Sequence, residues 1–116
     1  MKKFCFDLDG VIFFTKNNDY KRSKPKKKVI KIINHLYEKN FILIYTSRYM
    51  GRSNENEKLA KKRGYQFTLN QLKKWGLKFD KLKTGKPSYD VIVDDKSFDF
   101  RKSWLKKFQS KFKKDF

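Results

Sequence analysis

The chain has 116 residues, enough for one hydrophobic core and a single domain spanning residues 1–116. Apolar residues make up 38% of the sequence and aromatic residues 17%, which excludes a chain that is disordered throughout. Its one cysteine, Cys5, excludes an internal disulfide and is expected to be a core residue, and no apolar run approaches the roughly 20 residues of a membrane helix. We therefore expect a cytoplasmic protein without a membrane span.

The net charge of +19 comes from 31 basic residues set against 12 acidic ones. A strongly basic chain attracts polyanions such as nucleic acid, anionic lipid or a phosphorylated substrate. Most of the basic residues are lysines, and Lys, Asn, Ile and Phe are abundant together, as in AT-rich genomes. Codon bias is therefore the simpler explanation of the charge, and nucleic-acid binding stays open as the less favoured one.

The first part of the chain predicts a strand, a short flap and a helix. Lys3–Leu8 is nearly all apolar, which is typical of a central parallel strand. Val11–Phe14 is expected to form one arm of a flap, with a turn at Asn17–Asp19. Pro25 is expected to begin a helix that ends near Asn40, because proline suits the first turn of a helix.

The rest of the chain continues to alternate strands and helices. The expected elements are a strand Phe41–Tyr45, a helix Glu55–Trp75, strands Phe79–Leu82 and Tyr89–Val93, and a basic amphipathic helix after Arg101 that packs on the sheet. This order predicts an α/β fold, a three-layer sandwich around a mostly parallel sheet, with minimal or no cap.

Polar side chains follow the predicted strands. They are Asp7 and Asp9 after the first strand, Thr46 after the second, Lys86 after the third, and Asp94 with Asp95 after the fourth. Parallel strands bring their carboxyl ends to one edge of a sheet, where ligands bind. Clustered carboxylates favour a hard divalent cation, so Mg²⁺ is the expected cofactor. The ion and the ammonium would attract a phosphate, and an ionised carboxylate can attack phosphorus.

In this order the residues resemble the four motifs of the haloacid dehalogenase-like (HAD) superfamily of aspartyl-phosphate phosphatases. Asp7-Leu8-Asp9-Gly10-Val11 is similar to the first motif, Thr46 to the second, Lys86 to the third, and Val93-Asp94-Asp95 to the fourth. The resemblance covers residues 1 to about 98. Calcium loops also contain Asp-x-Asp-Gly, but here the third acidic ligand ahead of the glycine is missing.

The resemblance implies a Rossmann-like HAD core and a role for each motif residue. Asp7 would be the nucleophile and a Mg²⁺ ligand. Asp9 would be the general acid and base, with its backbone carbonyl on the metal. Thr46 would donate a hydrogen bond to a phosphoryl oxygen, and Lys86 would neutralise the phosphate.

Asp94 or Asp95 would complete the metal site, and Asp94 is favoured because it comes first after the strand. The match is closer to a capless subgroup of small phosphatases found with bacterial capsule and surface-polysaccharide genes, through Ile44–Arg48, Gly85–Pro87 and Val93–Lys96. Tyr-Thr-Ser-Arg stands here where those proteins often have Tyr-Thr-Ala-Arg. The subgroup implies a small phosphorylated metabolite, such as a sugar, polyol or amino-alcohol phosphate.

Ser47, Arg48 and Arg52 are candidate substrate contacts beside the second motif, and solvated loop charges are an equally good interpretation of the two arginines. An open site without a cap would take a large substrate or be covered by a neighbouring subunit, so a homo-oligomer is expected. Two alternatives remain: a polynucleotide 3′-phosphatase, and a catalytically inactive, nucleic-acid-binding HAD-like protein.

Overall fold

The structure, a computed structural model, describes all 116 residues. Its strands are β1 (Lys3–Phe6), β2 (Phe13–Phe14), β3 (Lys24–Pro25), β4 (Phe41–Tyr45) and β5 (Lys81–Lys83), and its α-helices are α1 (Lys27–Tyr37), α2 (Glu57–Lys74) and α3 (Trp104–Lys111). Three short 3₁₀ turns lie at Tyr20–Arg22, Gly51–Ser53 and Lys113–Asp115. The fold is α/β, as predicted. No helix combines the length and the apolar character needed to cross a bilayer.

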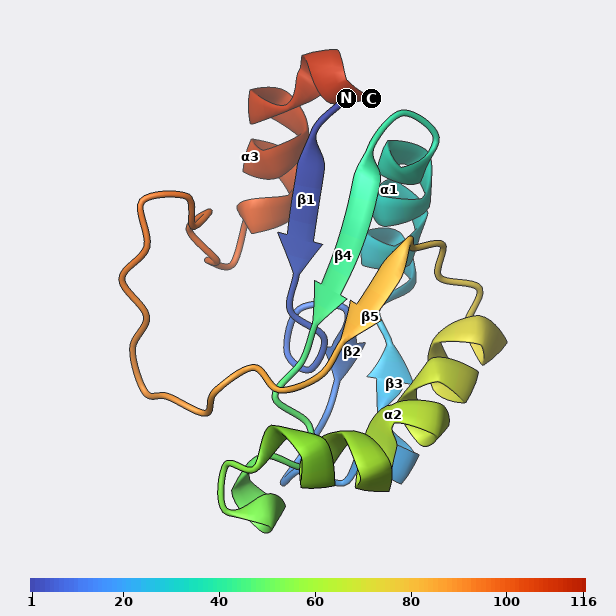
Figure 1. Cartoon of the computed structure of the whole chain (residues 1–116). Helices are drawn as coiled ribbons and strands as arrows, with labels where there is room; N and C mark the ends of the chain where they lie inside the picture. The colour runs from blue at the N-terminus through green and yellow to red at the C-terminus, as the bar shows by residue number, and fades with distance from the viewer.

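The main sheet has three parallel strands in the order β1-β4-β5 (Figure 1). Phe4 pairs with Ile42, and Phe6 pairs with Ile44, which in turn pairs with Leu82. Paired residues of neighbouring strands face the same side of a sheet. These five side chains are all buried, so they form the apolar face on which the core is built.

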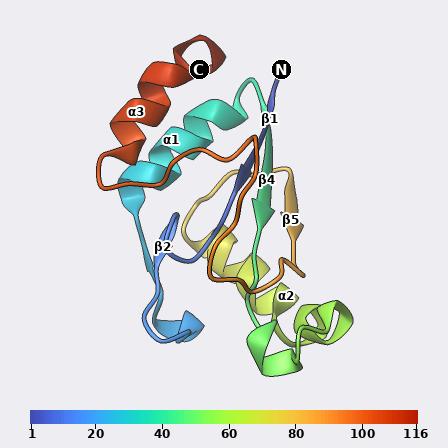
Figure 2. The ribbon, with the colours of Figure 1, turned by 90° about the vertical axis from the view of Figure 1, so that its left-hand side faces the viewer.

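The sheet is packed on one face. Ile33 and Leu36 of α1, Leu72 of α2 and Phe108 of α3 belong to the same buried cluster as the apolar face of the strands. Figure 2 shows α1 and α3 on the same side of the sheet. On the opposite face Cys5 is exposed, so the prediction that it is a core residue was wrong. The strands alternate in burial because helices cover a single face.

The predicted fourth strand, Tyr89–Val93, is not a strand. These residues lie in the loop between β5 and α3, where Val91 is 79% exposed and Val93 is 95% exposed. A Val-Ile-Val run suits a strand only where other side chains pack against it, and here none do. As a result β1 is an edge strand of the main sheet, and not a central one.

The flap is a small antiparallel hairpin made by β2 and β3. Phe13 pairs with Pro25, so this proline closes the hairpin and does not begin the helix as predicted. Proline fits an edge strand, where its missing N–H costs no ladder hydrogen bond. Helix α1 starts two residues later, at Lys27. In Figure 1 the flap lies below the carboxyl ends of the strands of the main sheet.

Helices α2 and α3 take the positions that shape the site. Asn56 caps α2, its side chain accepting a hydrogen bond from the Leu59 amide at 3.0 Å. The helix continues through Gly64, where a Cβ atom would lie within 2.1 Å of the Tyr49 ring. Figure 1 shows α2 crossing beneath the carboxyl ends of the strands. Helix α3 packs Phe108 against β1, as predicted for the closing helix.

Candidate active site

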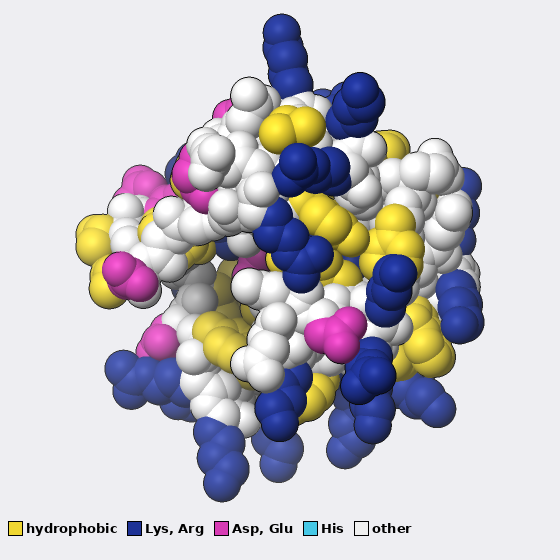
Figure 3. All heavy atoms as spheres, turned by 90° about the horizontal axis from the view of Figure 1, so that it is seen from below, with side chains coloured by type: hydrophobic (Ala, Val, Ile, Leu, Met, Phe, Trp, Pro, Cys, Tyr) yellow, Lys and Arg dark blue, Asp and Glu magenta, His cyan; other side chains and the backbone are white.

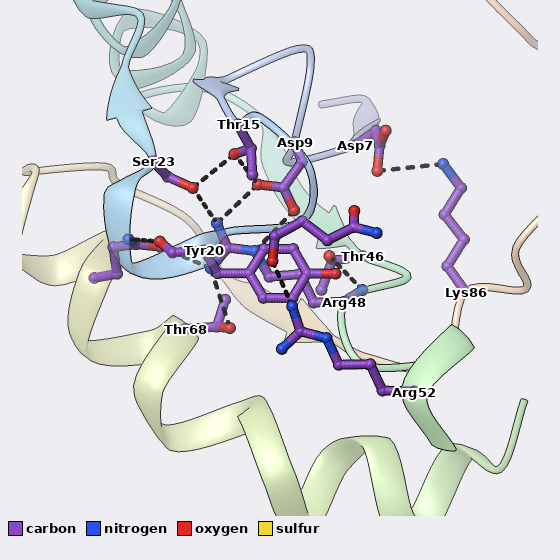
Figure 4. Close-up of polar contacts among 12 residues, drawn as sticks. Asp7, Asp9, Thr15, Tyr20, Ser23, Thr46, Arg48, Arg52, Thr68 and Lys86 are labelled. Atoms are coloured by element: carbon purple, nitrogen blue, oxygen red, sulfur yellow. Dashed lines mark hydrogen bonds and ion pairs between the residues drawn. The ribbon is translucent and has the colours of Figure 1, made fainter. Parts of the chain in front are cut away.

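Asp7 and Lys86 meet at the carboxyl edge of the main sheet. Asp7 directly follows β1, and the Lys86 ammonium lies 3.4 Å from its carboxylate (Figure 4). The loop that carries Lys86 is tied to the end of β4, because the Lys86 amide donates to the Thr46 carbonyl at 3.2 Å. Two residues that are 79 positions apart thus form one ion pair, as the prediction of a shared sheet edge required.

The surroundings of this ion pair shift the pKa values of both Asp7 and Lys86. Burial raises the pKa of the Asp7 carboxyl above its ordinary value of 3.8, although the neighbouring Lys86 charge lowers it in part. Burial works to lower the pKa of Lys86, but the hydrogen bond that its ammonium donates to Tyr89 and the Asp7 charge outweigh burial and raise the pKa above 10.5. Lys86 is therefore a permanent cation beside a partly desolvated carboxylate.

The molecular surface is hollowed on the side of the carboxyl edge. Figure 3 looks at the carboxyl edge from below and shows a hollow between the body of the protein and the projecting loop 84–103. The loop contains the acidic residues Asp90, Asp94, Asp95 and Asp99 along with an equal number of basic ones, and lysines and arginines surround the body. The side chain of Asp7 is 36% exposed and that of Lys86 is 15% exposed, so the pair is open to a ligand.

Asp9 forms a second ion pair that the sequence did not predict. Its carboxylate accepts two hydrogen bonds from Arg48, from Nε to Oδ2 and from Nη2 to Oδ1, both at 2.8 Å. The Thr15 hydroxyl donates to Oδ1 at 2.5 Å and lies 2.6 Å from the Ser23 hydroxyl. A carboxylate has about four acceptor positions, so this arrangement leaves one free on Asp9.

Arg48, one of the predicted substrate contacts, does not lie on the surface. The residue is 2% exposed, and all five of its N–H groups have acceptors. Besides Asp9, Nη2 donates to Ser23 at 3.3 Å, and Nη1 donates to Gln71 at 2.7 Å and to Thr68 at 3.4 Å. A buried guanidinium is tolerated when it is paired and hydrogen-bonded throughout, as it is here.

The other residues beside the second motif take different positions. Thr46 is 1% exposed, and its hydroxyl oxygen accepts from the Arg48 amide at 3.1 Å. Ser47 is half-buried, and its carbonyl accepts from the Met50 amide. Arg52 is exposed and donates to the Asn18 carbonyl at 2.6 Å. Of the three predicted substrate contacts, Arg52 and Ser47 are therefore partly accessible and Arg48 is enclosed.

The residues of the fourth motif are not placed beside Asp7. Asp94 and Asp95 are exposed in the loop 84–103. The Asp94 carboxylate accepts from the Lys96 amide at 2.8 Å, so it caps its own turn. No group of three or more His, Cys, Asp or Glu side chains is arranged to hold a metal ion. The predicted set of four metal ligands is thus not assembled in this conformation.

Sequence reasoning missed the residues that surround Arg48. They are Thr15, Tyr20 and Ser23 of the flap and Thr68 and Gln71 of α2. The buried positions of α2 are Ala60, Gly64, Thr68, Gln71 and Leu72. Ala60, Gly64 and Thr68 recur at every fourth position of the sequence, and this spacing of small and polar residues indicates a helix face that can pack on a buried charge.

Comparisons with known proteins identify a protein of similar fold but give no information on activity. Neither a scan against family models nor a search of curated proteins finds a match. A search of solved structures finds a crystal structure of a structural-genomics target from Vibrio cholerae, with a TM-score of 0.80 over 100% of both chains and 24% sequence identity. At that identity the likeness extends to the fold alone. The chain therefore has the same overall architecture as this bacterial protein.

Proposed function

We propose that this chain is a phosphomonoesterase of the HAD type, which forms an aspartyl-phosphate on Asp7. The observation that carries the proposal is the pair of Asp7 and Lys86 at the carboxyl edge, 3.4 Å apart and partly exposed to solvent. A nucleophile needs an accessible carboxylate, and a phosphate needs a fixed cation beside it. The HAD resemblance of the surrounding motifs supports the same assignment, including a Rossmann-like core.

The reaction would take two displacements at phosphorus. In the first, an Asp7 oxygen forms a bond to phosphorus, and the ester P–O bond breaks with its electron pair going to the leaving alcohol oxygen, which takes up a proton. In the second, water attacks phosphorus and loses a proton, and the bond to Asp7 breaks, which restores the carboxylate. Lys86 neutralises the charge on the phosphoryl group in both steps. The Thr46 hydroxyl is buried in this arrangement, so the residues around it must move before it can donate to a phosphoryl oxygen.

Asp9 would serve as the general acid and base. Its carboxylate is held by Arg48 and Thr15, and one acceptor position remains for the proton of a water or an alcohol. The side chain is 24% exposed, so solvent reaches it. This supports acceptance of a proton by Asp9 with the carboxylate fixed in one orientation, whereas its role as general acid rests on the HAD resemblance.

Mg²⁺ is the proposed cofactor, with Asp7 as its first ligand. Mg²⁺ is commonly bound by one or two carboxylates and by substrate phosphate oxygens, and it keeps several waters. Asp7 fits this requirement because its carboxylate is accessible and oxygen-rich ligands suit the ion. A bound ion would offset the repulsion between the Asp7 carboxylate and a phosphate. The Asp9 backbone carbonyl, Asp94 and Asp95 are the further proposed ligands, and for the last two the loop must move.

Substitution of Asp94 tests the fourth motif. Asp94→Asn is expected to raise the Mg²⁺ concentration for half-maximal phosphate release about tenfold, because a lost carboxylate weakens ion binding. Asp95→Asn tests the neighbouring carboxylate in the same titration. Asp90→Asn, an exposed residue of the same loop, is the matched control. If neither Asp94→Asn nor Asp95→Asn changes the titration, the fourth motif does not hold the metal.

The proposed substrate is a small phosphomonoester, and the subgroup resemblance favours a sugar, polyol or amino-alcohol phosphate used in surface-polysaccharide assembly. A second subunit covering the hollow is part of this proposal. The experiment is a panel of phosphorylated sugars, amino alcohols, nucleotides and 3′-phosphorylated oligonucleotides, assayed for phosphate release with Mg²⁺ and with chelator. Chelator-sensitive turnover of one class supports the proposal, and no turnover of any class contradicts it.

A groove between α2 and β5 favours nucleic-acid binding, which the second candidate, a polynucleotide 3′-phosphatase, requires. The groove has a volume of about 550 Å³ and is lined by Lys61, Lys73, Lys78 and Lys81 together with Tyr65 and Phe79. Sites for single-stranded nucleic acid usually combine lysines, which bind the phosphate backbone of the strand, with aromatic rings, which stack on its bases.

Binding of a single-stranded oligonucleotide tests this candidate. Four phosphate contacts predict a loss of affinity of about 50-fold between 50 and 200 mM salt. Lys73→Glu with Lys81→Glu should abolish most of the binding, whereas Lys102→Glu, exposed outside the groove, should not. Weak binding that neither the higher salt concentration nor the Lys73→Glu and Lys81→Glu substitutions reduce would contradict the candidate. Strong binding without any phosphate release would instead favour an inactive, nucleic-acid-binding protein.

A further inference from the structure

We propose that Arg48 is a positioning residue, which fixes the Asp9 carboxylate and ties it to both the flap and α2. This inference rests on the proposed function, because the reaction that Asp9 serves is the one proposed above. Arg48 lies outside the reach of solvent, with a residue exposure of 2%. It therefore acts on the reaction through Asp9 and not through the substrate.

The pairing with Asp9 is of a kind that sets orientation as well as distance. Two N–H groups of one planar guanidinium donate to the two carboxylate oxygens, each at 2.8 Å. A two-pronged contact of this type fixes the plane of the carboxylate, which a lysine ammonium cannot do. The side-chain rotation of Asp9, on which proton transfer depends, is thus set by Arg48.

The same guanidinium joins elements that are far apart in the sequence. On the flap it donates to the Ser23 hydroxyl and lies against the Tyr20 ring, with its central carbon 4.6 Å from the ring centroid. On α2 it donates to the Gln71 side-chain oxygen, and the Gln71 amide nitrogen donates back to the Tyr20 carbonyl at 2.8 Å. Figure 4 shows these contacts converging on Arg48.

The contacts of Arg48 therefore determine both the position of the flap and the orientation of the Asp9 carboxylate. Thr15 of the flap donates to Asp9 directly, so the carboxylate has partners on the flap as well as on Arg48. If the guanidinium is lost, the flap and Asp9 lose their shared anchor on α2. Asp7 and Lys86 would keep their own contact, because no Arg48 atom is bonded to either.

The test is Arg48→Lys, measured in two independent ways. Phosphate release should show kcat lowered about 100-fold, a typical cost of a misplaced catalytic group, with KM changed less than about threefold. Amide hydrogen exchange should show faster exchange in the flap, residues 10–25, with β4 unchanged. Arg22→Lys is the matched control, since this flap arginine is exposed and has no contact with Asp9.

Ser23→Ala provides a milder variant if Arg48→Lys fails to fold. Losing one neutral hydrogen-bond partner predicts a fall in kcat of about fivefold and faster flap exchange. Unchanged flap exchange in Arg48→Lys overturns the inference, as does a rise in KM with kcat preserved, which would mark a substrate contact. If the wild-type protein releases no phosphate, the proposed function fails, and the exchange experiment still decides whether Arg48 anchors the flap.

Discussion

Replacement of Asp7 by asparagine is expected to lower phosphate release by about 10⁴-fold or more, the scale seen when a catalytic nucleophile is removed. An amide oxygen does not form the covalent intermediate, and the substitution also removes a carboxylate from the proposed Mg²⁺ site. Lys86 loses its ionic partner but remains in place through the backbone hydrogen bond to Thr46. The measurement is phosphate release from the best substrate of the panel at saturating Mg²⁺.

Stability supplies the control for that experiment. Burial raises the pKa of the Asp7 carboxyl, so the folded state binds its proton more tightly than the unfolded state does. The ionised carboxylate therefore destabilises the fold above its folded pKa, and this penalty disappears as the pH falls below 3.8. Asp7→Asn should consequently unfold at a higher temperature than the wild type at pH 7 without metal, and the gain should shrink near pH 3. Undiminished phosphate release from this stably folded variant would contradict the assignment of Asp7.

The largest loss of stability is expected at Arg48. Arg48→Met should lower the free energy of unfolding by about 3–5 kcal/mol, because Asp9 is left as a carboxylate without its partner inside the protein. A loss of this size approaches the total stability of many domains, about 5–15 kcal/mol. Denaturation in urea measures it, and Arg22→Met, at an exposed position, should change the stability by less than about 0.5 kcal/mol.

The double variant separates the pair from the rest of the network. Arg48→Met with Asp9→Leu removes both charges, so its loss should be smaller than the sum of the two single losses. The remaining loss would come from the hydrogen bonds to Ser23, Thr68 and Gln71. Strictly additive losses would mean that the ion pair contributes nothing beyond its separate contacts.

Local sequence patterns predicted the parts of the fold that depend on local residues. The apolar strand Phe41–Tyr45 and the helix around Val29 and Leu36 follow hydrophobic periodicity, and the structure has both. The segment Tyr89–Val93 has an equally strong apolar pattern, yet it lies exposed. The pattern states what a segment would do if it were packed, and packing depends on contacts that the segment itself does not encode.

The candidate site also has a part that local sequence patterns predicted and a part that they did not. The spacing of Asp7 and Lys86 from their strands placed them at one sheet edge, and they do form an ion pair. Arg48 follows Thr46 by two residues, which placed it in a loop and suggested an accessible charge. Its burial depends on Tyr20 and Gln71, which lie 28 and 23 residues away and carry no motif. A buried charge is predictable when its long-range partners are known, and the sequence pattern did not identify them.

The most direct test of the proposed function is to identify the covalent intermediate. The wild-type protein would be mixed with a phosphorylated substrate and Mg²⁺, quenched in acid within milliseconds, reduced with tritiated borohydride, which releases the phosphate and converts the aspartyl-phosphate to labelled homoserine, and digested. We expect the modification on the peptide that contains Asp7, and none in Asp7→Asn. Release of phosphate with the modification on another residue, or with no covalent intermediate at all, would contradict the proposal.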